Sequence, residues 1–161
     1  KREINMKFFI ASCILTLSSL VAQELKIKAN SFHADEKKGI SVFEGKVNIL
    51  RDKDELNAQK VTVYTDEKNQ PLKYIAQGDT SFTVVTKDGS VYKGEAQKVI
   101  YQPKEKEYYF FTDVHLRQLD EKKEIIGNEV VLKTIEGKAY AKGAKSEPVI
   151  MIFKMPQDEE K

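Results

Sequence analysis

The side chains that most often perform chemistry in proteins are few in this sequence, and they stand apart from one another. The two histidines, His33 and His115, each lie alone in a strand-like segment, so they predict neither a metal pair nor a catalytic dyad. The single cysteine, Cys13, lies in an apolar N-terminal run. No serine elbow and no phosphate-binding glycine loop is found. We therefore expect a protein that is not an enzyme and that holds no metal and no cofactor.

Two short clusters could bind a ligand, but their composition favours a structural role. The acidic stretch 52–55 (DKDE) lacks the glycine and the terminal glutamate of a calcium loop, so we interpret it as a solvated turn. The aromatic run 108–111 (YYFF) could stack on nucleic-acid bases. In a strand, however, two of these rings face each side of the sheet. We interpret at least one of the two pairs as part of a core.

The first 22 residues predict a helical secretory signal segment. Lys7 follows Met6 and precedes the apolar run 8–22, FFIASCILTLSSLVA, which is the pattern of a basic n-region and an apolar h-region. This run is shorter than the roughly 20 apolar residues that span a bilayer. Residues 10–13 match a lipobox, but almost no apolar segment precedes them, so we do not expect lipidation. Cleavage after Ala22 would export the rest of the chain, whereas an uncleaved segment would anchor it in the membrane.

The charge balance excludes surfaces that bind polyanions. The chain has a formal net charge of +2, and residues 1–22 hold three basic side chains and one acidic side chain. The remainder therefore carries 24 basic and 24 acidic side chains. Nucleic acids bind to a basic stripe and anionic membranes to a polybasic patch. The remainder also contains no cysteine, so its stability must come from a core and a hydrogen-bond ladder.

Beyond residue 23 the sequence predicts only β-strands. Segments rich in Val, Ile, Thr, Tyr and Phe alternate between apolar and polar residues, which is the period of a strand with one buried face. Charged turn clusters separate these segments at 35–39, 51–54, 66–71, 87–90, 102–106, 120–123 and 136–138. In the fourth cluster, Asp88-Gly89 predicts a two-residue hairpin turn, because such turns need positive φ.

Each segment is longer than an ordinary strand of about five or six residues, so an interruption near its middle predicts a bend. The interruptions are Gly45, Gly78, Gly94, Thr112-Asp113, Gly127 and Gly143. The sequence AQKV at 58–61 recurs at 96–99 and, more loosely, at 127–130, a repeat typical of quasi-one-dimensional arrays. We predict an all-β fold: an antiparallel meander of bent strands that forms an open, folded-over β-jellyroll with two facing sheets.

Six half-strands carry two apolar residues at positions i and i+2, which places both side chains on one face. These residues are Val47 and Ile49, Val61 and Val63, Phe82 and Val84, Val99 and Tyr101, Val114 and Leu116, and Val130 and Leu132. We predict that they line the space between the two sheets.

An ordered set of short motifs runs through the first half of the chain: Ala29 followed by Asp35, then GKVNI at 45–49, then LNAQKVTVY at 56–64. With these motifs the sequence resembles the LptA, or OstA-like, family of lipopolysaccharide-transport proteins over residues 25–145. The sequence departs from the family pattern at Gln59 and again at Gln97, where the family often has aspartate. Residues 146–161 match no part of that pattern.

The resemblance implies a periplasmic jellyroll domain at 23–145 that carries lipopolysaccharide from the inner to the outer membrane. The acyl chains of lipid A would bind to the apolar residues of the interior. The implied partners are lipopolysaccharide, LptC-like inner-membrane and LptD-like outer-membrane jellyrolls, and further copies of the chain joined head to tail. Three alternatives stay open: a membrane-anchored LptC-like component, another exported lipid-binding β protein, and an exported structural β protein without a ligand groove.

A meander that does not close leaves two edge strands that other chains can extend. One predicted edge contains Leu25, Ile27 and Ala29; the other, in the C-terminal segment 146–161, contains Val149, Ile150, Met151, Ile152 and Phe153 and is followed by an acidic tail. Because the two surfaces differ, contacts between them would propagate as open filaments. Alternatively, residues 149–154 tuck back over the core.

Overall fold

The structure, a computed structural model, describes residues 24–155, and over that range the chain forms ten β-strands and no helix. The strands are β1 (Leu25–Lys28), β2 (Ser31–Asp35), β3 (Ile40–Arg51), β4 (Asp54–Thr65), β5 (Pro71–Val85), β6 (Val91–Gln102), β7 (Glu107–Gln118), β8 (Lys123–Lys133), β9 (Lys138–Lys142) and β10 (Ile150–Phe153). The described part of the chain has no helix that could cross a membrane. The predicted signal segment and the acidic tail after Met155 lie outside the described residues.

All ten strands belong to one antiparallel sheet. Its order is β1-β3-β4-β5-β6-β7-β8-β10, with β2 beside β3 and β9 beside β8. Because β1 pairs with residues 48–51 and β2 with residues 40–44 of the same strand, these two strands act as one bent strand at the start of the stack. At the other end, β9 and β10 pair in the same way with the two halves of β8. The predicted antiparallel meander is confirmed.

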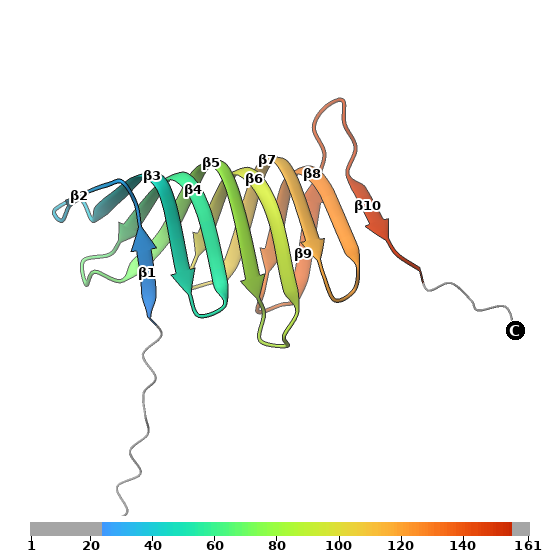
Figure 1. Cartoon of the computed structure of the whole chain (residues 1–161), viewed down its shortest axis with the longest axis horizontal. Helices are drawn as coiled ribbons and strands as arrows, with labels where there is room; N and C mark the ends of the chain where they lie inside the picture. Colours follow the sequence, from blue (N-terminus) through green and yellow to red (C-terminus); the bar gives the residue numbers. More distant parts are fainter. Residues whose placement is uncertain (1–23, 156–161) are drawn as a thin grey trace, which may run out of the picture.

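The sheet folds over along a line through the middle of β3 to β8, so that it forms two facing half-sheets (Figure 1). The front half-sheet consists of β1, residues 47–51, 54–58, 80–85, 91–96, 114–118 and 123–127, and β10. The back half-sheet consists of β2, residues 40–44, 60–65, 71–77, 98–102, 107–111 and 129–133, and β9. The strand pairing shifts register at the fold line, as it does at β-bulges.

Two kinds of bend alternate along this fold line. In β3, β5 and β7 two consecutive residues have positive φ, namely Gly45-Lys46, Gly78-Asp79 and Thr112-Asp113. In β4, β6 and β8 the fold line passes through Ala58-Gln59, Ala96-Gln97 and Gly127-Asn128, none of which has positive φ. The bends predicted at Gly45, Gly78, Thr112-Asp113 and Gly127 are therefore confirmed.

The Ala-Gln repeat marks two of the bends that contain no glycine. Ala58 and Ala96 are buried against the core. Gln59 and Gln97 each donate a hydrogen bond from Nε2 to the carboxylate of Asp79, with N···O distances of 3.3 and 3.5 Å. An aspartate at either glutamine position could not donate this bond. The glutamines thus connect neighbouring bends across the outside of the fold line.

The bend predicted at Gly94 is wrong, because this glycine lies within a regular part of β6. A Cβ here would lie 2.5 Å from the carbonyl oxygen of His115 and 2.6 Å from Cζ of Phe82. The Phe82 ring fills the place of the missing side chain and stacks on Phe110 of the back half-sheet, with ring centroids 4.5 Å apart. The glycine at this position therefore provides space for an aromatic contact between the half-sheets.

Two further predictions differ in length from the structure. Gly143 does separate the half-strands β9 and β10, but it begins the loop 143–149 instead of a bend within one continuous strand, and a Cβ there would clash with the carbonyl oxygen of Glu147. The connection between β5 and β6 spans residues 86–90 instead of two residues, and Gly89 is the member with positive φ. The Gly89 amide donates to the carbonyl of Thr86 at 2.9 Å, which closes the longer turn.

Candidate functional site

The twelve residues that the sequence predicts to line the interior all face the space between the half-sheets. Ile49 and Tyr101 are partly buried and pack against the core. The other ten are buried members of one cluster that joins both half-sheets: Val47, Val61, Val63, Phe82, Val84, Val99, Val114, Leu116, Val130 and Leu132. Contact of these residues with lipid stays a prediction.

Strand alternation places the neighbouring polar side chains on the outer surface. Asn48, which lies between two interior residues, donates from Nδ2 to Oδ1 of Asn57 on the adjacent strand at 2.8 Å. Alternation also divides the aromatic run 108–111: Tyr108 and Phe110 are buried in the interior, and Tyr109 and Phe111 are not. The interpretation of one aromatic pair as core is therefore confirmed.

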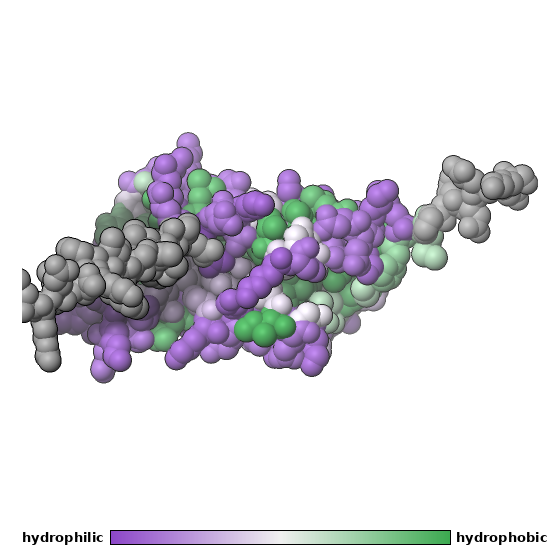
Figure 2. Space-filling model, turned by 90° about the horizontal axis from the view of Figure 1, so that it is seen from below, coloured by the Kyte–Doolittle hydropathy of each residue, from purple (hydrophilic) through white to green (hydrophobic). Residues whose placement is uncertain are grey.

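The interior has one long open edge, opposite the fold line. There, hairpin turns end each half-sheet separately, and within residues 24–155 no strand runs from one half-sheet to the other. Figure 2, which views the molecule from below, shows hydrophobic residues exposed among hydrophilic ones on this side. The arrangement is amphipathic in cross-section, with an apolar interior and charged turns at the water boundary.

A cavity of about 100 Å³ lies in the interior near the start of the stack. Its lining brings together five of the twelve predicted residues, Ile49, Phe82, Val84, Val99 and Tyr101. For comparison, an apolar cavity of about 150 Å³ admits a benzene molecule. The side chains of the two half-sheets therefore nearly fill the interior at this end.

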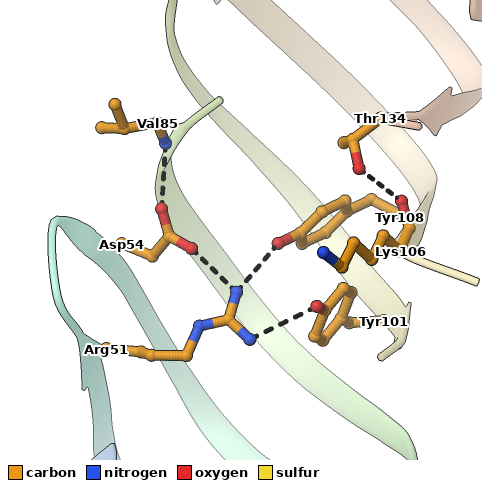
Figure 3. Close-up of polar contacts among 7 residues, drawn as sticks. All are labelled: Arg51, Asp54, Val85, Tyr101, Lys106, Tyr108 and Thr134. Atoms are coloured by element: carbon orange, nitrogen blue, oxygen red, sulfur yellow. Dashed lines mark hydrogen bonds and ion pairs between the residues drawn. The ribbon is translucent and has the colours of Figure 1, made fainter. Parts of the chain in front are cut away.

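A polar group borders this cavity at the open edge (Figure 3). Arg51, the last residue of β3, donates from Nη1 to the hydroxyl of Tyr101 at 3.3 Å and from Nη2 to that of Tyr108 at 3.5 Å. Nη2 also lies 2.9 Å from Oδ2 of Asp54. The guanidinium carbon is 5.2 Å from the centroid of the Tyr101 ring, a cation–π distance.

The Arg51 guanidinium keeps its charge at neutral pH, and the nearby phenols do not ionise. Burial opposes the charge of Arg51, but its hydrogen bonds to Asp54 and Tyr101 outweigh burial and hold the pKa of Arg51 above its ordinary value. Burial raises the pKa of the Tyr108 phenol and also that of Tyr74. The guanidinium therefore stays charged, and both phenols stay neutral.

The sequence interpretation missed Arg51, because it assigned residues 51–54 to a charged turn cluster between two strands. Arg51 and Tyr101 are 50 positions apart, and only the tertiary fold brings them together. One signal was present in the alternation: Val47, Ile49 and Arg51 occupy successive positions on the same face. A charged side chain on an otherwise apolar face is unusual unless it has a partner.

The predicted edge strands lie at the two ends of the sheet order, β1 at one end and β10 at the other. Ala29 falls just after β1, and Val149 falls just before β10. Every residue of β10 is exposed, so residues 149–154 do not tuck back over the core. The sequence did not predict that β2 and β9 form the corresponding edges of the back half-sheet.

The two histidines lie on different strands, β2 and β7, and have different surroundings. His33 is exposed, and Nε2 of His115 lies 2.7 Å from Oε2 of Glu124 on the adjacent strand. The hydrogen bond to His115 lowers the pKa of Glu124. Within residues 24–155 no three acidic, histidine or cysteine side chains come together as metal ligands.

Comparison with known proteins gives a family and a fold. The model of a family described as "LptA/(LptD N-terminal domain) LPS transport protein" matches residues 26–138. The structure is similar to that of LptH from Pseudomonas aeruginosa, described as the LptA homologous periplasmic component of the conserved lipopolysaccharide transport device, with a TM-score of 0.72 and 18% sequence identity. The similarity covers 83% of this chain and 96% of LptH. No curated protein matches the chain significantly.

Proposed function

Because this chain belongs to the LptA/(LptD N-terminal domain) family of LPS transport proteins, we propose that it is a periplasmic bridge protein that carries lipopolysaccharide from the inner to the outer membrane. The acyl chains of lipid A travel between the half-sheets, and the sugars stay in water beyond the open edge. Burial of each methylene is worth about 0.8 kcal/mol. Binding that depends on apolar area, and not on one polar pocket, permits the lipid to slide.

The observation that carries this proposal is an apolar interior that continues to both ends of the stack. At the first end, Leu25 and Phe32 are 42% and 59% exposed. At the last end, Met151 and Phe153 are each 52% exposed, and their register with β8 places them on the same face as Ile125, which packs against the core. A second jellyroll placed at either end would extend this apolar path.

Photo-crosslinking tests the path with matched neighbours. A photoreactive amino acid at Val84 or Ile49, which face the interior, should label lipopolysaccharide. The same amino acid at Thr83 or Asn48, one residue away on the same strands, should not. Equal labelling of both members of a pair would refute an interior path.

The same proposal assigns the terminal strands to assembly. β1 and β10 differ in sequence and lie at opposite ends of the sheet, so copies of the chain join head to tail. LptC-like and LptD-like jellyrolls occupy the ends of the resulting bridge. Unpaired backbone groups on the edge strands provide the contact by strand addition.

The backbone of β10 shows which amides are free for such a contact. The amide of Lys154 donates to the carbonyl of Lys122 on the β8 side at 3.3 Å. Because amides alternate in direction along an antiparallel strand, those of Ile150 and Ile152 also point toward β8, whereas those of Met151 and Phe153 point to the free edge. Strand addition at β10 would use the latter two amides.

Proline substitution tests this assignment. Met151→Pro and Phe153→Pro should leave the chain folded and abolish concentration-dependent assembly in analytical ultracentrifugation, since each removes an amide at the free edge. Ile152→Pro is the control: it should detach β10 from β8. Assembly of the Met151→Pro/Phe153→Pro chain at wild-type strength would exclude β10 as the contact.

Periplasmic location is proposed from the signal pattern of residues 1–22. N-terminal sequencing of the chain from a periplasmic fraction should begin near Gln23. Recovery of the full-length chain in the inner membrane would instead support the LptC-like alternative.

A further inference from the structure

Arg51 makes a direct connection between the two half-sheets at the open edge. Arg51 ends a front strand, whereas Tyr101 and Tyr108 flank the hairpin turn between β6 and β7 in the back half-sheet (Figure 3). The two Arg51–tyrosine hydrogen bonds, at 3.3 and 3.5 Å, therefore cross the mouth of the interior. Among residues 24–155, no other side-chain hydrogen bond joins the rims of the two half-sheets at this edge.

Both sides of this connection are held in position. On the front side, Asp54 bonds Arg51 through Oδ2 and accepts the backbone amide of Val85 at Oδ1, each at 2.9 Å. On the back side, the hydroxyl of Thr134 donates to the carbonyl of Lys106 at 2.7 Å, which fixes the turn that precedes Tyr108. We call Arg51, Asp54, Tyr101 and Tyr108 the clasp.

The clasp also forms part of the wall of the interior cavity. At about 100 Å³, this cavity is smaller than the roughly 150 Å³ that accommodates benzene, and an acyl chain is far longer than benzene. This volume does not enclose a whole acyl chain, so movement of the two half-sheets apart would let acyl chains enter this end of the interior. The connections that oppose such a movement at the mouth are those of Arg51 to the two tyrosines.

We propose that the clasp is a gate, closed in the lipid-free chain, and that Arg51 must release Tyr101 and Tyr108 before acyl chains pass the first-strand end of the interior. This inference rests on the proposed function. The salt bridge to Asp54 stays within the front half-sheet, so Arg51 keeps a partner for its charge when the gate opens. An uncompensated buried charge would oppose opening, and this arrangement avoids it.

The test removes the two hydroxyls and keeps the rings. In Tyr101→Phe/Tyr108→Phe the aromatic lining and the 4.4 Å ring stacking stay in place, but Arg51 loses both connections to the back half-sheet. Stopped-flow association of fluorescently labelled lipopolysaccharide should become about three- to tenfold faster, since each lost bond to a charged group lowers the cost of opening. Tyr109→Phe, which removes a hydroxyl outside the interior on the same strand as Tyr108 and touches no Arg51 bond, should associate at the wild-type rate.

The opening itself can be measured between two exposed turn residues on opposite rims. Spin labels are attached at Lys53→Cys and Lys104→Cys in a chain with Cys13→Ser. Pulsed electron paramagnetic resonance then measures the distance between the two labels, which reports the width of the mouth. The distance should be short in the lipid-free chain and lengthen when lipopolysaccharide binds. In the labelled Tyr101→Phe/Tyr108→Phe chain the long distance should already be populated without lipid.

Arg51→Lys is a second variant, because a lysine can keep the Asp54 salt bridge but cannot bond two tyrosines in fork geometry. It should widen the mouth as the double variant does. Wild-type distances and association rates in both variants would overturn the gate while leaving the proposed function intact. Failure of the wild-type chain to bind lipopolysaccharide at all would overturn the proposed function, and the gate with it.

Discussion

The two ends of the strand stack present similar edges but are attached to the fold in different ways. At the first end, β1 and β2 meet at Asn30, whose amide donates to the carbonyls of Glu44 and Gly45 at 3.1 and 2.9 Å. The rings of Phe32 and Phe43 also pack there in a tilted arrangement, with centroids 4.8 Å apart. At the last end, the loop 143–149 separates β9 from β10, and every residue of these two strands is exposed.

This difference shows that backbone pairing alone does not make an edge rigid. The first end has backbone hydrogen bonds to a bend, a contact between two aromatic rings, and the nearby clasp. The last end depends mainly on its pairing with β8. Segments with few buried apolar contacts open at low free-energy cost, so we expect the last end to adapt to a partner and the first end to present a preformed surface. Four predictions test this contrast, in order of decreasing effect.

The largest difference in the free energy of unfolding is expected between a variant at the centre of the stack and a variant at its last end. Phe110 is fully buried and joins both half-sheets, so Phe110→Ala should lower the free energy of unfolding by about 3–5 kcal/mol. Phe153→Ala removes the same side chain from an exposed site and should change it by no more than about 0.5 kcal/mol. Urea denaturation of both variants measures the difference. Similar losses would mean that β10 is as tightly packed as the centre.

The second prediction tests how tightly Asn30, which joins β1 and β2, packs against the bend at Gly45. Gly45 and Gly137 have φ of 80° and 64°, so alanine at either position should cost about 1–2 kcal/mol of backbone strain. At Gly45 the new Cβ would also lie 2.6 Å from Nδ2 and 2.9 Å from Cβ of Asn30, whereas nothing lies within 4 Å at Gly137. Gly45→Ala should therefore lose about 1–3 kcal/mol more than Gly137→Ala in thermal unfolding. Equal losses would show that Asn30 moves aside freely.

The third prediction compares one isoleucine from each terminal strand. Ile27 packs against the core, so Ile27→Ala should destabilise the monomer by about 1–2 kcal/mol. Ile152 is exposed, and Ile152→Ala should cost no more than about 0.5 kcal/mol while weakening assembly measured by light scattering. A large loss of monomer stability from Ile152→Ala would contradict the idea of an adaptable last end.

The smallest effect concerns pH. A hydrogen bond to Lys60 lowers the pKa of Glu44 near the first end, and one to His115 lowers the pKa of Glu124 near the last end. Because the folded pKa lies below the unfolded value, each contribution is present above the ordinary glutamate pKa of 4.5 and is lost as the pH falls through the folded pKa. The melting-temperature differences between wild type and Glu44→Gln or Glu124→Gln should thus shrink below pH 4.5. Differences that persist unchanged at lower pH would exclude carboxylate ionisation as their cause.

Local patterns were sufficient to predict much of the fold. Alternation at positions such as Val61 and Val63 identified the interior face, because successive side chains in a strand point to opposite sides. The charged clusters identified the hairpin turns, and Gly45 and Gly78 identified two of the bends through their need for positive φ. These features depend on a few neighbouring residues, so they can be recognised without knowledge of the rest of the chain.

Other features had no local signal. The bends at Ala58-Gln59 and Ala96-Gln97 contain no positive φ and look like regular strand in the sequence. The glycine at position 94 suggested a bend, yet it accommodates the Phe82 ring, which pairs with it from the neighbouring strand. The alternation also changes phase at the first of these bends: Leu56 and Ala58 face the interior before it, and Val61 and Val63 face the interior after it.

The sequence by itself thus determined which side chains face the interior, since that property follows from the covalent geometry of an extended chain. Only the tertiary structure decided what meets across the interior. Phe82 reaches Phe110, and Arg51 reaches Tyr101, because the position of each contact depends on the register of every strand between them and on where the sheet folds. The candidate gate at the open edge is a product of that accumulated register.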